Sequence, residues 1–267
     1  MNDRVVELSV TGAGVATVTM NRPDVHNAFD ETLIAELTRT MRAVDDDASV
    51  RIVILAANGK SFSAGADLNW MKRMAHYSEA DNLRDALHLA ELMRTIDRMR
   101  KPTIARVQGH AFGGGVGLVA CCDIAVAAKA ATFSLSEVRL GLIPAVISPY
   151  VVRAIGERAS RRFFLTAERF SAEQALSLGL VSEVADVEWL DASIDALVDH
   201  LVKGGPQALA AAKDLIRAVA DRPIETAVVE DTAQRIARTR ASAEGKEGIA
   251  AFLEKRAPAW VEPPESN

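Results

Sequence analysis

Apolar residues in the first part of the chain follow patterns that predict strands and helices in turn. Residues 5–10 and 15–20 flank a Gly12-Ala13-Gly14 turn, which predicts a β-hairpin. Residues 30–47 carry an apolar stripe at spacings of four, four and three, which predicts a helix capped by Asp30; the stripe consists of Leu33, Leu37, Met41 and Val44. The next run, RIVILAA at 51–57, is typical of a strand buried on both faces of a parallel sheet.

The alternation continues through the middle of the chain. Ser78 and Asp81 form a capping-box pattern that begins a helix ending before Pro102, with an apolar side made of Leu83, Leu87, Ala90, Met93 and Ile96. Strands are predicted at 103–107, 123–128 and 133–135, and a glycine-rich turn and a short helix separate the first two. Strand–loop–helix units of this kind predict an α/β core.

From Ser148 onward the pattern is mostly helical. Ser171 and Gln174 form a second capping box, with Gly179 as a stop signal, and further helices are predicted at 190–202, 206–220 and 244–255. The break at Gly204-Gly205-Pro206 suggests a core of residues 1–203 and a helical region of residues 204–267. Residues 257–267 have no periodicity, and we expect them to be loose.

Composition and charge narrow the classes of function. The chain is 49% hydrophobic and 25% charged, as in ordinary globular domains, and its net charge of −5 argues against a nucleic-acid partner. No apolar stretch is suited to spanning a membrane, and residues 1–10 do not resemble a signal peptide. Cys121 and Cys122 fit buried free thiols, so we expect a reducing cytoplasm. The five histidines are dispersed, so we expect no metal site.

Two glycine-rich segments follow predicted strands, at residues 62–67 and 109–115. Glycines let the backbone approach a ligand closely, and the first N–H groups of a following helix lack partners. Two such ends facing one point would form an oxyanion hole, although each alone also fits a plain tight turn. Gly59-Lys60-Ser61 does not complete a phosphate-binding P-loop, because Ile54 stands where the earlier glycine is required. Residues 113–117 lack the G-x-G-x-x-G spacing, because Leu118 stands where the last glycine should be.

Carboxylates near these segments are the candidates for acid–base chemistry. Glu137 lies between Leu135 and Leu140, where burial would raise its pKa and suit a general acid or base. An exposed Glu137 paired with Arg139 fits the local sequence equally well. Asp67 directly precedes an apolar stretch, and helix capping is the role that this position favours.

Several motifs occur in an order that resembles the enoyl-CoA hydratase/isomerase, or crotonase, superfamily over nearly the whole chain. They are NRPDVHNAF, SFSAGADL, GHAFGGGVGL with CDIAVAA, SEVRLGLIP and EGKEGIAAFLEKR. The resemblance implies an α/β crotonase-like spiral of β-β-α repeats with a helical C-terminal trimerisation region. It also implies a homotrimer or homohexamer and an acyl-CoA thioester partner. No tightly bound cofactor is expected, since coenzyme A enters as part of the substrate.

The same resemblance assigns roles to individual residues. The N–H groups of Ala66 and Gly114 would form the oxyanion hole for the thioester oxygen, and Glu137 would be the acid–base group. The Ala64 carbonyl would meet the adenine ring, and Phe252 and Lys255 would touch coenzyme A bound to a neighbouring subunit. The other positions that we assign to substrate and coenzyme A binding are Val25, His26, Asp67, Leu68 and Gly117.

One departure from the family pattern leaves the reaction open. The best-known hydratases carry two glutamates; the second is Glu137, but the first falls on Gly117. Adding water is simplest with two carboxylates, whereas moving a double bond needs one base. The segment around residues 145–148 is similar to a bacterial branch described as methylglutaconyl-CoA or related hydratases of leucine or isoprenoid breakdown. The hypotheses are a hydratase of short or branched 2-enoyl-CoA, a Δ3–Δ2 enoyl-CoA isomerase, or a non-catalytic acyl-CoA-binding protein.

Overall fold

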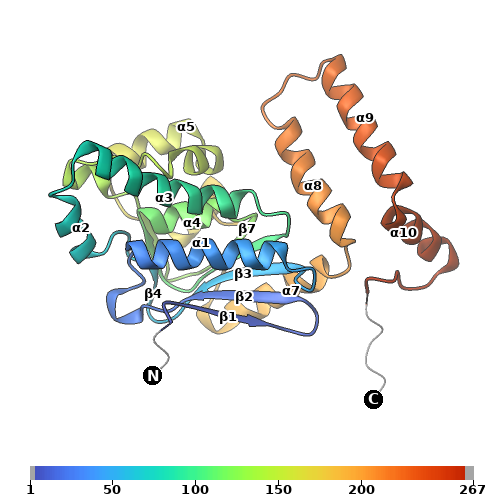
Figure 1. Ribbon diagram of the computed structural model, residues 1–267, viewed down its shortest axis with the longest axis horizontal. Coiled ribbons are helices and arrows are strands. Elements are labelled where there is room, and N and C mark those ends of the chain that lie inside the picture. Colours follow the sequence, from blue (N-terminus) through green and yellow to red (C-terminus); the bar gives the residue numbers. More distant parts are fainter. Residues whose placement is uncertain (1–3, 262–267) are drawn as a thin grey trace.

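The computed structural model describes residues 4–261, which form two β-sheets, covering helices and a helical arm (Figure 1). The strands are β1 (Val6–Val10), β2 (Val15–Met20), β3 (Ile52–Ala57), β4 (Ser61–Ser63), β5 (Thr103–Val107), β6 (His110–Phe112), β7 (Ile124–Ala128), β8 (Thr132–Ser134), β9 (Phe170–Ser171) and β10 (Glu183–Ala185). The α-helices are α1 (Glu31–Asp46), α2 (Leu68–Met74), α3 (Glu79–Asp97), α4 (Gly114–Cys121), α5 (Ser148–Thr166), α6 (Ala172–Leu178), α7 (Leu190–Leu201), α8 (Pro206–Val219), α9 (Thr226–Ala241) and α10 (Ala243–Glu254). Short 3₁₀ turns are η1 (Pro23–Val25), η2 (Glu137–Leu140) and η3 (Val187–Trp189).

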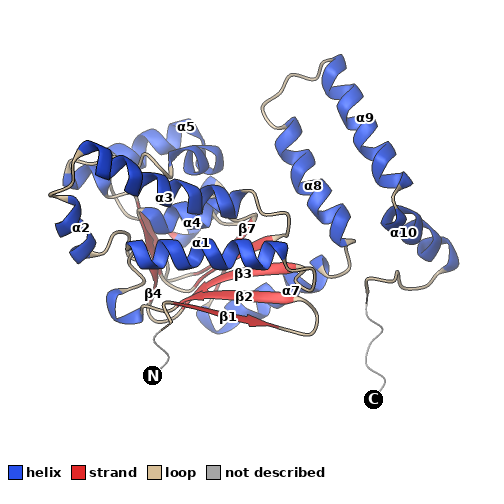
Figure 2. Ribbon diagram, viewed as in Figure 1, coloured by secondary structure: helices blue, strands red, loops and turns tan. Residues whose placement is uncertain are grey.

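From β3 to β8, successive strands alternate between the two sheets. Figure 2 shows the strands of the larger sheet, among them β1, β2 and β3, below helix α1. The larger sheet has the order β1-β2-β3-β5-β7-β10, and the smaller has the order β4-β6-β8-β9. Each pair from β3-β4 to β7-β8 therefore places one strand in each sheet before the chain continues into helix, which is a spiral of β-β-α units. This confirms the predicted α/β fold class. The β1–β2 hairpin and the parallel, fully buried strand β3 are also confirmed.

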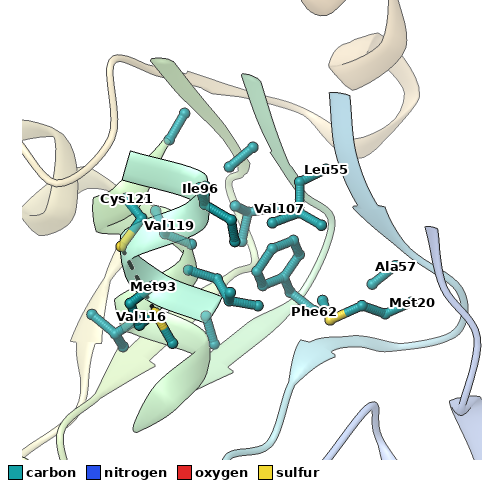
Figure 3. Close-up of a cluster of buried hydrophobic side chains, with 14 of the residues drawn as sticks. Met20, Leu55, Ala57, Phe62, Met93, Ile96, Val107, Val116, Val119 and Cys121 are labelled. Carbon is teal, nitrogen blue, oxygen red and sulfur yellow. Dashed lines mark hydrogen bonds between the residues drawn. The ribbon is translucent and has the colours of Figure 1, made fainter. Parts of the chain in front are cut away.

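The core lies between the sheets and the helices α1, α3 and α4 (Figure 3). α1 buries the predicted stripe, and Asp30 accepts a hydrogen bond from the Leu33 N–H. The capping box of Ser78 and Asp81 is present, but the stripe predicted for α3 is wrong at its start. Leu83 and Leu87 are 60% and 56% exposed, because only the second half of α3 packs against the core.

The last three helices form an arm that lies beside the core (Figure 1). Lys213 of α8 ties it to the core by pairing with Asp123 at 2.6 Å and donating to the Lys101 carbonyl. Neither α9 nor α2 was predicted as a separate helix. Residues 257–261 are held more firmly than predicted, since the Trp260 carbonyl accepts a hydrogen bond from Arg51. The rest of the predicted loose tail, residues 262–267, lies outside the described residues.

Candidate active site

The first glycine-rich segment leaves one backbone donor free at the end of β4. Phe29 donates to the Gly65 carbonyl at 2.7 Å, and Asp67 donates to the Phe29 carbonyl at 2.8 Å. This bridge requires Gly65 to take a φ of 88°, a conformation that favours glycine. The bridge uses the Gly65 carbonyl and the Asp67 N–H, on either side of Ala66, but not the Ala66 N–H, which has no acceptor within residues 4–261. Ala66 is exposed, so a ligand can reach this donor.

The second segment places another donor at the start of α4. Gly113, with a φ of 51°, donates to the Ser134 carbonyl at 2.9 Å and caps the helix without a side chain. Gly114 is the first residue of α4, so its N–H cannot bond within the helix, and it finds no acceptor elsewhere in the described chain. The positive end of the helix adds to the attraction of this donor for a developing negative charge.

The two glycine-rich ends and Glu137 lie together. A β-carbon built on Gly113 would lie 3.9 Å from the Gly65 Cα and 3.1 Å from the Glu137 Oε1. Residues next to these glycines carry the two free donors, Ala66 and Gly114. The structure therefore brings the three predicted catalytic groups to one place, from β4, α4 and the turn after β8.

Glu137 is partly buried and makes no ion pair with Arg139 in the described chain. It opens η2 directly after β8, and its Oε2 is buried with no hydrogen-bond partner within residues 4–261. Burial raises the pKa of the Glu137 carboxyl, because the charged form loses its hydration without gaining a cation. The alternative of an exposed Glu137 paired with Arg139 is wrong. A carboxyl that holds its proton more tightly suits proton transfer near neutral pH.

Gly117 lies one turn further along α4, against Ile147, a contact that sequence reasoning missed. A β-carbon on Gly117 would lie 2.9 Å from the Ile147 Cβ, closer still to the Ile147 Cγ2, and 3.3 Å from the Met93 Cε. Ile147 is only 2% exposed. The sequence around it predicts only an apolar turn, and no local signal points to a partner 30 residues away.

The residues predicted to contact coenzyme A are neighbours beside β4. Ala64 donates to the His26 carbonyl at 2.9 Å, and the His26 ring nitrogen Nδ1 lies 3.1 Å from the Ser61 Oγ. Val25 is exposed at the end of η1. Asn27, which sequence reasoning also missed, is fully buried and donates to the carbonyls of Asn58 and Ser61. This amide fixes the turn that presents Val25 and His26 next to Ala64.

Asp67 caps α2, as its position favoured. Its carboxylate accepts hydrogen bonds from the N–H groups of Asn69 and Trp70 at 2.8 and 3.1 Å, and Arg22 lies 3.3 Å away. Burial works against the charged form, but these hydrogen bonds and Arg22 outweigh it and lower the pKa of Asp67. Leu68, the first residue of α2, is 75% exposed.

Phe252 and Lys255 are not brought to this site within one chain. They lie at the end of α10, in the arm, whereas α2 and β4 lie at the opposite side of the molecule (Figure 1). The Phe252 side chain is 82% exposed. The predicted contact of these two residues with coenzyme A therefore requires a second copy of the chain.

Other features of the described chain lie outside this site. A cavity of about 470 Å³ is lined by residues of the core and of α8, among them Arg153 and Lys213, but by none of the predicted site residues. Both cysteines are free, and residues 4–261 contain no group of three His, Cys, Asp or Glu side chains that could hold a metal. Of the helices described, none combines the length and apolar character needed to cross a membrane.

Comparisons with known proteins agree with this geometry. Residues 10–263 match the model of the enoyl-CoA hydratase/isomerase family. A 2,3-dehydroadipyl-CoA hydratase of Escherichia coli is 32% identical over 91% of this chain and 94% of its own length. A crotonyl-CoA hydratase of Syntrophomonas wolfei is 32% identical over 91% and 92%. The crystal structure of an enoyl-CoA hydratase from Shewanella pealeana superimposes with a TM-score of 0.94 and 48% identity, covering 97% of each chain.

A β-β-α spiral with two free backbone donors beside a buried carboxyl defines a protein of the crotonase superfamily. Within it, the chain belongs to the enoyl-CoA hydratase/isomerase family. The resemblance inferred from the five motifs is thereby confirmed.

Proposed function

We propose that this chain is an enoyl-CoA hydratase, a lyase that adds water to a short or branched 2-enoyl-CoA thioester. The observation that carries the proposal is the buried, unpaired carboxyl of Glu137 beside the free N–H groups of Ala66 and Gly114. The hydratase names of relatives that cover over nine-tenths of the chain support it.

The chemistry follows from the roles that we assign to these groups. The thioester oxygen accepts hydrogen bonds from Ala66 and Gly114, which stabilise the negative charge that develops there in the enolate. Glu137 gives its proton to the α-carbon while water bonds to the β-carbon. One proton of that water then returns to Glu137, so the carboxyl is restored at the end of each turnover.

Substrate binding is assigned to the groups around the same strand end. In this proposal Val25, His26 and the Ala64 carbonyl hold the adenosine part of coenzyme A, while Asp67 positions α2 and Leu68 lies beside the thioester arm. Coenzyme A is a part of the substrate rather than a resident cofactor. Phe252 and Lys255 come from a second subunit.

The assembly that this requires is a homotrimer or homohexamer formed through the arm. The arm supports this proposal because it carries several exposed apolar side chains: Ile216, Ile224, Val229, Ile236, Ile249, Phe252 and Leu253. Apolar surface of this extent on an extended element is typical of a protein–protein interface. The free thiols Cys121 and Cys122 fit a reducing compartment, the cytoplasm.

The test is incubation with crotonyl-CoA and with a 3-methyl-branched 2-enoyl-CoA, following loss of the absorbance of the conjugated thioester. We expect hydration of both, with the higher kcat/KM for the branched substrate. Failure to add water to either thioester would refute the proposal.

A Δ3–Δ2 isomerase is the second candidate, and the packing of Ile147 against Gly117 favours it. That position holds no second carboxylate, and a single base is enough to move a proton between the α- and γ-carbons. Supplying a 3-enoyl-CoA separates the two functions. An isomerase generates the conjugated absorbance and leaves it in place, whereas a hydratase acts on the 2-enoyl thioester.

A further inference from the structure

Two glycines at the start of α4, Gly113 and Gly117, lie against Glu137 and Ile147 respectively. Gly117 donates a hydrogen bond to the Gly113 carbonyl at 3.3 Å, so the two glycines are one helical turn apart. Gly113 is the N-cap of α4, with a non-helical φ of 51° and ψ of −119°, and Gly117 lies within the helix. Glu137 Oε1 lies against the first glycine, and Ile147 lies against the second.

Position 117, where the family pattern has the other carboxylate, therefore lies one helical turn from the glycine that Glu137 contacts. Ile147 occupies the space beside Gly117, supported by Met93, which also contacts Cys121 of α4 (Figure 3). Ile147 is only 2% exposed, and a β-carbon on Gly117 would overlap its side chain, so no side chain fits at position 117 while Ile147 stays in place.

We propose that Ile147 is a specificity-determining residue that closes the second acid–base position, so that Glu137 carries every proton transfer alone. This inference rests on the proposed function. In hydration, the Glu137 proton forms the new C–H bond at the α-carbon as the carbon–carbon π bond breaks. The water oxygen bonds to the β-carbon, and one water O–H bond breaks to return a proton to Glu137. In isomerisation the same carboxylate takes a proton from one carbon and returns it to another.

The packing part of the proposal is tested by thermal unfolding without substrate. Gly117→Glu alone should lower Tm or abolish soluble protein, because its side chain meets Ile147. Ile147→Gly makes room, and glycine is tolerated at the N-cap position that Ile147 occupies before α5. The double variant Gly117→Glu/Ile147→Gly should unfold at a higher temperature than the sum of the single changes predicts.

The matched control combines Gly117→Glu with Ile194→Ala. Ile194 is similarly buried, at 3% exposure, but belongs to the other core cluster, so its effect should be additive. A wild-type Tm for Gly117→Glu alone, or an additive effect of Ile147→Gly, would overturn the packing claim.

The catalytic part is tested by the pH dependence of kcat/KM for hydration. We expect one ionisation in the wild type, two in Gly117→Glu/Ile147→Gly, and one in the isosteric control Gly117→Gln/Ile147→Gly. The hydration-to-isomerisation ratio should rise by roughly tenfold or more in the glutamate variant over the glutamine control. Two ionisations in the wild type, or identical profiles in the two double variants, would overturn the inference.

A wrong hydratase assignment and a wrong role for Ile147 give different results. If the wild type hydrates no enoyl-CoA, the proposed function is wrong, and the same profiles are then measured for isomerisation. The coupling between positions 117 and 147 is read from Tm in either case.

Discussion

Replacing Glu137 with glutamine should change activity and stability in opposite directions. The amide keeps the size and shape of the side chain but cannot give or take a proton at neutral pH. General acid–base catalysis contributes about 10²–10⁴-fold for one transfer, so kcat should fall by at least about 10², equal to roughly 3 kcal/mol. Binding of a saturated acyl-CoA should change little, because the two backbone donors remain.

Stability should rise at neutral pH because the wild type buries a charged carboxylate oxygen with no partner, whereas the amide in the same place is neutral. An unsatisfied buried polar group costs about 1–3 kcal/mol, and a charged one more. The native pKa lies above the ordinary value of 4.5, so the native state holds the proton more tightly than the unfolded state. Wild-type stability therefore falls as pH rises from about 4.5 through the native pKa, and the glutamine variant lacks that loss.

The assay compares Tm of the two proteins across pH 4–8 alongside kcat on crotonyl-CoA, with Glu188→Gln as the control at an exposed position. A gain of 1 kcal/mol corresponds to about 2–4 °C for a chain of this size. The difference in Tm should vanish near pH 4 and be largest at pH 8. Wild-type turnover in Glu137→Gln would refute its catalytic role, and a lower Tm at pH 8 would refute the argument from burial.

Three further outcomes follow from the site and the arm. Gly114→Pro removes a backbone donor, and Gly114→Ala is its control because alanine keeps the N–H. Both variants add a β-carbon, which would lie 2.9 Å from the Phe29 ring. We expect kcat/KM to be about 10²-fold lower in the proline variant than in the alanine variant, and equal values would contradict an oxyanion role. Asp67→Ala should lower the unfolding free energy by about 1 kcal/mol at pH 7, where the Asp67 cap is charged. The loss should become smaller as pH falls through the lowered pKa of Asp67, and a loss that grows toward low pH would contradict the capping role. Phe252→Ala should raise KM for the thioester with little change in kcat. Sedimentation of the wild type should show a trimer or hexamer. A monomeric wild type, together with an unchanged KM in the variant, would contradict the shared site.

Much of the fold could be predicted because local physics and tertiary packing agree there. The stripe of α1 is buried along its whole length, and β3 is apolar because both of its faces are covered. The prediction for α3 failed where tertiary context decides, since Leu83 and Leu87 follow the helical period but extend beyond the core. The arm helix α9 was missed because most of its residues are polar, and Val228 is its one buried residue in the described chain.

The donors of the candidate site were predictable for a physical reason. A backbone N–H is available whatever the side chain, so glycine-rich strand ends reveal it through the turns that they require. Gly65 and Gly113 both take positive φ, which is the property that makes these segments visible in the sequence. The alternative of two plain turns could be set aside only when both were found beside Glu137.

Gly117 shows what a single sequence cannot supply. Read alone, a glycine where a carboxylate is expected does not say whether water or another side chain fills the space. Its meaning depends on Ile147, which is distant in sequence and has no polar atom to draw attention to it. In the structure, buried Ile147 packs against Gly117, so position 117 is closed to a side chain and forms part of the core. The reaction that this site performs then depends on how much chemistry one buried carboxyl can do, which is why Glu137 and the pair at positions 117 and 147 must be varied together.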